Sequence, residues 1–316
     1  MSNTYATKGL PLPPPVSKTT LPMAGLLVDV YGLDELPSGS TAAPAPAPPN
    51  PGRMARPRRL GGPRPRRPLL DMPNHGSRLV SEQANLAWDG GNASHALDML
   101  GMVKGGCADM RGLMDLVAGY LGREVDAHVC LGWSLGGHSA WQAWVGEERI
   151  DAAVAVVGCP DFMGLMRDRA VSTELDYGAS FLGSKYFPPD LIATCLAYDP
   201  KAILFGTTTV PAVPLTTSEQ TRLRPVLDAR VRGKRLLLCS GAEDALVPYV
   251  NGQPLIEVLK EAVGTEGWYR EGKVVLEDRV YEGIGHRFSA GMVEDAVRFL
   301  VEAVEAGPRG RREEKL

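Results

Sequence analysis

The fold is decided by residues 125–137, which read VDAHVCLGWSLGG. The apolar run up to residue 131 predicts a strand, and the segment that follows has the pattern G-x-S-x-G. Residues 135–145 have the composition of a helix, so Ser134 would occupy a tight corner between strand and helix with its hydroxyl exposed. Gly132 and Gly136 are expected where a larger side chain would clash with the turn. Ser134 is therefore a candidate nucleophile.

A serine hydroxyl is unreactive at neutral pH unless a base removes its proton. Of the five histidines, His286 lies in a glycine-flanked loop directly after a predicted strand and before the last helix. His128 falls inside a strand, His138 follows the serine by one helical turn and is expected to point away from the corner, and His95 begins a helix at the surface. These positions favour His286 as the base.

The base in turn needs an acid to orient it, and the acid should follow another strand. Asp244 lies three residues beyond Gly241, just after a predicted strand, and its short side chain can hold an imidazole firmly. Glu243 is adjacent, and Asp161 follows the preceding strand, so both are alternatives. Asp244 is the favoured acid, which places the three residues in the chain order serine, acid, histidine.

The remaining elements alternate between strands and helices. Strands are also predicted at residues 26–31, 69–72, 152–157, 234–239 and 273–281, and helices at 93–121, 255–263 and 290–305. The helix at 93–121 is expected in two pieces, broken near Gly105 and Gly106. This alternation predicts an α/β fold with a mostly parallel central sheet and helices on both faces.

The composition changes abruptly along the chain. Residues 37–68 contain ten prolines and seven arginines but no acidic residue, so we expect a low-complexity insertion that cannot bury a core. It interrupts a domain predicted over 19–306, in which 161–232 would form a small cap region. A disordered arm is expected at 1–18 and a charged tail at 307–316.

The overall composition excludes several classes of function. The formal net charge of −3 argues against a nucleic-acid partner. The five cysteines are scattered without a C-x-x-C pair, which argues against a zinc site and favours a reducing cytoplasmic location. No apolar stretch reaches the ~18 residues of a membrane span. We expect no metal and no organic cofactor.

Residues 69–306 resemble the α/β-hydrolase superfamily. The resemblance rests on the turn DMPNHGSR at 71–78, the corner at Ser134, the pattern G-x-x-D-x-x-V-P around Asp244 and the pattern G-x-G-H ending at His286. The corner is similar to that of small esterases, and the region before Asp244 to dienelactone-hydrolase and prolyl-peptidase-like domains. The resemblance implies an eight-stranded sheet with these three residues after strands five, seven and eight, and a cap that selects the acyl group.

The resemblance also implies two backbone donors for an oxyanion, one from Leu135 and one following the third strand. The only strand predicted upstream of residue 69 is 26–31, which ends before Gly32. If it is the third strand, Gly32 is the second donor. If it belongs to the first two strands, the third is missing and residues 37–68 stand in its place. A mis-joined reading frame would explain that replacement, and a transcript encoding an apolar strand there would establish it.

The expected function is hydrolysis of a small ester or thioester through an acyl-enzyme on Ser134. A peptidase or amidase of the same fold is the first alternative. A catalytically impaired hydrolase fold that only binds its ligand is the second. The Pro/Arg-rich insertion at 37–68 is either a solvated segment without function or a docking segment for SH3-like or acidic partners.

Overall fold

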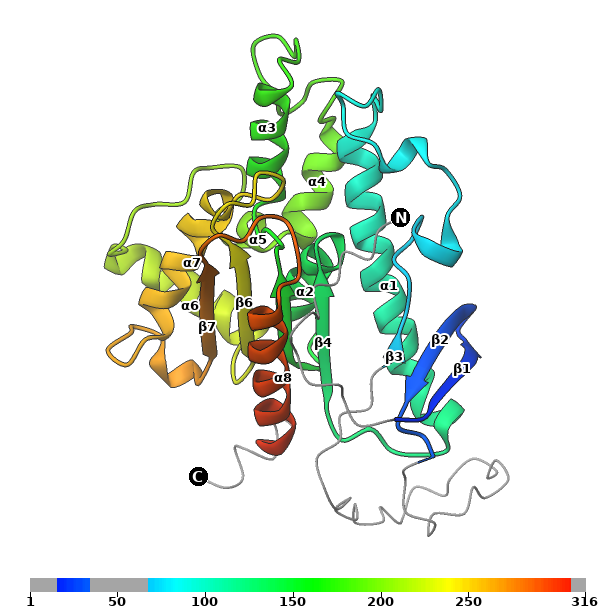
Figure 1. Cartoon of the computed structure of the whole chain (residues 1–316). Coiled ribbons are helices and arrows are strands. Elements are labelled where there is room, and N and C mark those ends of the chain that lie inside the picture. The colour runs from blue at the N-terminus through cyan, green and yellow to red at the C-terminus, as the bar shows by residue number, and fades with distance from the viewer. Residues whose placement is uncertain (1–15, 35–67, 308–316) are drawn as a thin grey trace.

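The computed structural model describes residues 16–34 and 68–307. The expected arm, the Pro/Arg-rich insertion and the charged tail fall outside these residues except at their margins. Helices and strands alternate over residues 95–305, apart from a run of four helices within 162–230, and three strands precede them (Figure 1).

A parallel sheet forms the centre of the molecule. Its strands are hydrogen-bonded in the order β4 (His128–Trp133), β5 (Ile150–Val156), β6 (Arg235–Gly241) and β7 (Val275–Tyr281). Every residue of β5 is buried, as the run of small and β-branched side chains requires of a strand covered on both faces. The four strands coincide with predicted ones, and their carboxyl ends share one edge of the sheet.

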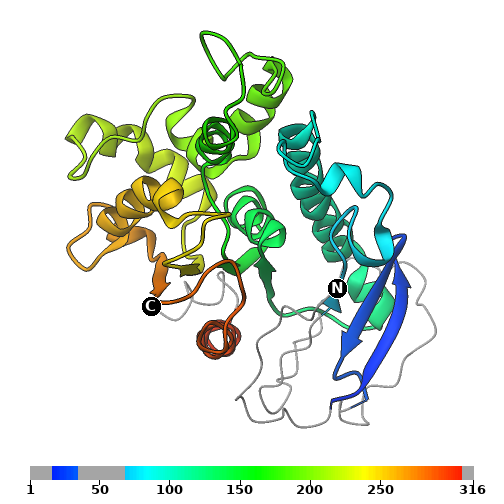
Figure 2. The same ribbon diagram turned by 45° about the horizontal axis from the view of Figure 1, so that its top comes forward.

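Helices cover both faces of this sheet, as the sequence predicts. On one face lie α2 (Leu135–Gly146), α6 (Thr217–Arg230) and α7 (Tyr249–Val263), which share a core with the sheet. The other face is covered by α8 (Ala290–Glu305), seen end-on in Figure 2. The predicted fold class is therefore correct.

Helix α1 (His95–Leu121) is continuous, and the predicted break near Gly105 is wrong. A Cβ atom at Gly105 would lie 2.8 Å from the Pro73 ring, and one at Gly106 would lie 2.7 Å from Met72 Cε. These glycines therefore allow the preceding loop to pack closely against the helix, and they do not end it.

A second, antiparallel sheet contains β1 (Lys18–Met23), β2 (Leu26–Tyr31) and β3 (Pro68–Leu69). It packs against α1 and is not hydrogen-bonded to the parallel sheet (Figure 1). The described residues thus form two sheets in place of one eight-stranded sheet, and β4 is an edge strand among them. Residues 26–31 form a hairpin strand, which favours the alternative in which they do not supply the third strand.

Above the carboxyl ends of the strands stand α3 (Phe162–Ser172) and α4 (Pro189–Tyr198), followed by the short α5 (Pro200–Phe205) (Figure 1). Aromatic side chains fill the cluster around α3 and α4, among them Trp88, Phe181 and Phe187. Helix α6, also expected in the cap, packs instead in the main core through Leu223 and Leu227. Among the described residues there are also three 3-10 turns, at Gly76–Arg78, Gln83–Asn85 and Arg270–Gly272.

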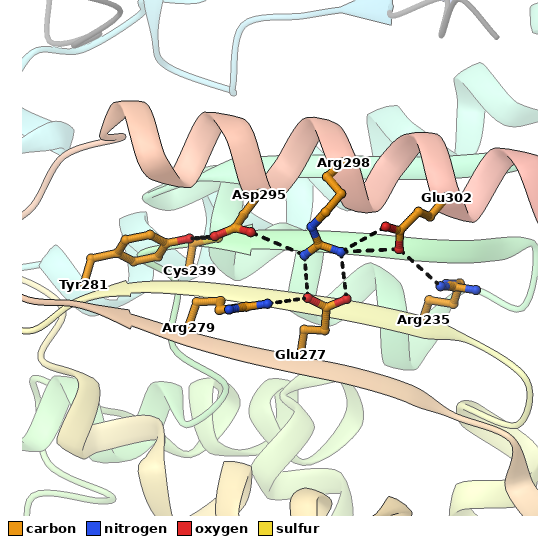
Figure 3. A network of polar contacts seen from close by, with 8 residues as sticks. All are labelled: Arg235, Cys239, Glu277, Arg279, Tyr281, Asp295, Arg298 and Glu302. Atoms are coloured by element: carbon orange, nitrogen blue, oxygen red, sulfur yellow. Dashed lines mark hydrogen bonds and ion pairs between the residues drawn. The ribbon is translucent and has the colours of Figure 1, made fainter. Parts of the chain in front are cut away.

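A polar network joins α8 to β7 (Figure 3). Arg298 Nη2 donates to Glu277 Oε2 at 2.5 Å, and Tyr281 Oη donates to Asp295 Oδ2 at 2.6 Å. The hydrogen bond from Arg298 holds the pKa of Glu277 below its usual range. These bonds hold β7 and α8 together, the two elements between which the 282–289 loop runs. Every helix within residues 16–34 and 68–307 is too short or too polar to span a bilayer.

Candidate active site

Ser134 occupies the corner between β4 and α2 that the sequence predicts. Its backbone has φ 55° and ψ −115°, a combination that non-glycine residues rarely adopt. The Ser134 N–H donates to Val156 O at the end of β5, at 2.9 Å. Such a conformation costs on the order of 1–3 kcal/mol, and the surrounding structure must hold it in place.

Close backbone contacts enforce this corner. A Cβ atom at Gly132 would lie 1.8 Å from Gly136 O, and one at Gly137 would lie 2.7 Å from Val156 O. Position 136 itself has open space around it. The steric requirement predicted for Gly136 is therefore wrong, and it belongs to Gly137, which packs against Gly158 after β5.

The side chains of Ser134, His286 and Asp244 lie together at the carboxyl edge of the sheet. Ser134 Oγ is 2.7 Å from His286 Nε2, and His286 Nδ1 is 2.8 Å from Asp244 Oδ2. Because the carboxylate accepts the Nδ1 proton, Nε2 is the nitrogen that can accept the serine proton. The side chain of Asp244 is 1% exposed, whereas that of His286 is 18% exposed.

Asp244 is held by its own loop. Its Oδ1 accepts N–H groups from Leu246 and Val247, both at 2.9 Å. Burial alone would raise the pKa of Asp244, but the hydrogen bonds from His286, Val247 and Leu246 outweigh it and hold the pKa below its usual value. The carboxylate is therefore charged and fixed in direction at neutral pH.

The two alternative acids have other surroundings. Glu243 is exposed, and its backbone N–H donates to Ile284 O at 3.0 Å, which ties the Asp244 loop to the His286 loop. Asp161 caps α3, since its Oδ1 accepts the Gly164 N–H at 2.9 Å. Neither carboxylate has a hydrogen bond to His286.

His95 is buried and not at the surface, which corrects the sequence-based expectation. His138 is buried as well, and its Nδ1 is 3.0 Å from Cys159 O. Burial lowers the pKa of both to about 4, so both imidazoles are neutral at pH 7. Neither has a hydrogen bond to Ser134. His128 is half-buried in β4, as expected of a strand residue.

The two expected oxyanion donors differ in their surroundings. Leu135 is the first residue of α2, and a helix leaves its first N–H groups without intrahelical partners. Gly32, in contrast, follows β2 in the separate sheet, and its N–H donates to Ser17 O at 2.9 Å. The structure therefore does not bring a free Gly32 donor to Ser134.

The turn at 71–78 is held by local hydrogen bonds. Asp71 Oδ2 accepts both the N–H and the hydroxyl of Ser77 at 2.8 Å, and Arg78 pairs with Asp109 of α1 at 2.5 Å. Within residues 16–34 and 68–307, no group of histidine, cysteine and carboxylate side chains is arranged to hold a metal ion.

No protein-family model and no curated protein matches this sequence. Among solved structures, TT1662 from Thermus thermophilus is similar at a TM-score of 0.53 and 17% identity, over 93% of this chain and 100% of that one. An S-formylglutathione hydrolase from Agrobacterium tumefaciens has a TM-score of 0.36 and 18% identity, over 60% of this chain and 54% of that one. MGS-M1, an α/β-hydrolase enzyme from a deep-sea metagenome library, has a TM-score of 0.35 and 14% identity, over 65% of both chains.

At these identities the likeness concerns the fold alone. The chain itself carries a parallel sheet covered on both faces, with Ser134 between a strand and a helix. Asp244 and His286 follow later strands, in the order that is typical of one superfamily. We conclude that this protein has the fold of the α/β-hydrolase superfamily.

Proposed function

We propose that this protein is a serine hydrolase that cleaves a small ester or thioester through an acyl-enzyme on Ser134. The observation that carries the proposal is the continuous chain of hydrogen bonds from Ser134 Oγ through His286 to Asp244, at 2.7 and 2.8 Å. A base within hydrogen-bonding distance of the hydroxyl, oriented by a buried carboxylate, is the arrangement that activates a serine.

In the first step His286 Nε2 takes the proton of Ser134 as Oγ bonds to the acyl carbon. Collapse of the tetrahedral species breaks the bond to the alcohol or thiol, which leaves with the proton from His286. In the second step His286 removes a proton from water, and the resulting hydroxide bonds to the acyl carbon. The bond between that carbon and Ser134 Oγ then breaks, His286 returns its proton to Oγ, and the free acid leaves. Asp244 keeps the imidazole in the required tautomer and stabilises the imidazolium that forms in both steps.

The N–H of Leu135 is the donor that we assign to the oxyanion. One donor fewer than the usual two costs ~10²–10³ in turnover. Esters and thioesters are intrinsically more reactive than amides, because their leaving groups need less assistance from an acid. We therefore propose a small activated acyl compound as the substrate class, with amides as the alternative.

The free thiols of the five cysteines support a reducing cytoplasmic location.

The proposal predicts hydrolysis of p-nitrophenyl acetate and of a short acyl thioester at a rate well above that of an amino-acid p-nitroanilide. Ser134→Ala should abolish this activity, whereas Ser180→Ala, at an exposed serine of the 173–188 segment, should not change it. The measurement is the steady-state kcat/KM for each substrate. Equal rates for Ser134→Ala and the wild type would refute the proposal, and a faster anilide reaction would favour an amidase.

A further inference from the structure

We propose that Arg169, on helix α3, is a positioning residue that orients Asp244 through a single peptide unit. The inference rests on the proposed function and extends it, because it connects the helices above the site to the acid. Arg169 is not itself in hydrogen-bonding contact with Ser134, His286 or the Asp244 carboxylate.

The contact lies in the loop that carries the acid. Arg169 Nη2 donates to Leu246 O at 2.8 Å. That carbonyl belongs to the same planar peptide unit as the Val247 N–H, which donates to Asp244 Oδ1 at 2.9 Å. The guanidinium thus holds one end of the peptide plane while Asp244 holds the other, so the plane cannot rotate without losing both bonds.

Four successive hydrogen bonds connect the Arg169 guanidinium to Ser134 Oγ. Asp244 accepts the Val247 N–H on Oδ1 and faces His286 on Oδ2, so rotation of the carboxylate would move the imidazole as well. A positively charged donor on the carbonyl also polarises the peptide and strengthens the N–H bond to Asp244. Arg169 therefore affects both the direction of the carboxylate and the strength with which it is held.

Arg169 is itself held from the opposite side by α1. Its Nη1 is 3.0 Å from His95 Nε2 and 3.3 Å from Met99 Sδ. Burial, together with the charge of Arg169, lowers the pKa of His95 to about 4, so the imidazole is neutral at pH 7. Its Nδ1 is 3.0 Å from Leu86 O, which leaves Nε2 as the acceptor for the guanidinium. His95 thus directs Arg169 towards the acid loop.

A purely structural role would give a different pattern of effects. If Arg169 only joined α3 to α1 and to the 244–247 loop, its replacement would lower the stability of the protein. It would also lower kcat by the same factor in the wild type and in Asp244 variants. If it acts through Asp244, its loss should matter only while Asp244 can accept the Val247 N–H and orient His286. Arg167 is a matched control, because it is an exposed arginine on the same helix.

The test compares Arg169→Gln, Arg169→Lys and Arg167→Gln in the wild type and in Asp244→Asn, using p-nitrophenyl acetate. A small misplacement of a catalytic group can cost up to ~10²-fold, so we expect Arg169→Gln to lower kcat about 10- to 100-fold. KM should change less than about threefold, and Arg169→Lys should recover part of kcat because it retains a charged donor. When Asp244→Asn is already present, adding Arg169→Gln should lower kcat by less than about threefold.

The inference would be overturned if the kcat losses of Arg169→Gln and Asp244→Asn multiplied fully in the double variant. Equal kcat values for Arg169→Gln and Arg167→Gln would also overturn it. Amide hydrogen exchange gives an activity-independent readout, because Arg169→Gln should accelerate exchange at Val247 relative to Arg167→Gln. Unchanged exchange there would also overturn it. Failure of the proposed function would look different, since the wild type would then not hydrolyse the ester and the Val247 result would still stand.

Discussion

Replacing His286 by alanine is expected to lower kcat by ~10⁴–10⁶, with the protein still folded. The imidazole is the only base within hydrogen-bonding distance of Ser134 Oγ among the described residues, and Oγ is a poor nucleophile without it. His75→Ala is the matched control, because that ring is exposed and its Nδ1 contacts only Pro73 O of its own turn. Steady-state hydrolysis of p-nitrophenyl acetate, together with the circular dichroism of each variant, provides the measurement.

The kcat losses of variants at Ser134, His286 and Asp244 should not combine in full, because the three residues act together. Ser134→Ala combined with His286→Ala should be no slower than Ser134→Ala alone, and Asp244→Asn should cost about 10⁴ in kcat. A double variant that loses the product of the two single factors would show that His286 and Ser134 contribute separately. That result would contradict the proton-transfer role of His286.

A second large effect is expected at Gly132, where alanine should destabilise the protein by more than about 3 kcal/mol. Its Cβ would lie 1.8 Å from Gly136 O and 2.2 Å from Gly136 C, and backbone atoms cannot move aside as a flexible side chain can. The strand or the start of α2 must therefore shift. Urea unfolding at neutral pH measures the change.

Gly136→Ala is the matched control for this prediction. It lies in the same motif, but its Cβ would have open space, and alanine is the better residue in a helix by up to ~1 kcal/mol. The changes in unfolding free energy caused by the two substitutions should therefore have opposite signs or differ by several kcal/mol. Similar unfolding free energies for the two would contradict the close approach of Gly132 and Gly136.

Much of the parallel sheet could be predicted from local patterns. Strands such as β5 and β6 are short apolar runs between polar turns, and helix α8, which covers one face, carries its buried side chains at helical spacing. The sequence also places Ser134, Asp244 and His286 after strands, which are β4, β6 and β7, and the carboxyl ends of parallel strands meet at one edge. The structure brings these three side chains within hydrogen-bonding distance.

Other features depend on contacts between distant segments and left no local signal. Gly105 looks like a helix break, yet the ring of Pro73 fills the space that a side chain would need. His95 looks like a surface residue at a helix start, but the aromatic cluster around Trp88 buries it. The contact of Arg169 with Leu246 joins residues that are 77 positions apart, so no motif could reveal it.

The hairpin strand β1 shows a different difficulty. The turn between β1 and β2 has Ala24 and Gly25 at φ 51° and 77°, the conformation of the tightest hairpins, but alanine is an uncommon residue there. Without a typical Asn-Gly or Asp-Gly pair, the sequence does not signal a turn. The sequence therefore does not indicate the strand before this turn, nor that residues 26–31 belong to an antiparallel sheet.

The central claim is that Ser134 is an activated nucleophile, and covalent labelling tests it most directly. The folded protein should be incubated with a fluorophosphonate, digested, and its peptides identified by mass spectrometry. We predict a single phosphonylated site, Ser134, whose labelling slows by orders of magnitude in His286→Ala. Folded wild-type protein that remains unlabelled, or that is labelled at another residue while Ser134 stays free, would contradict the claim.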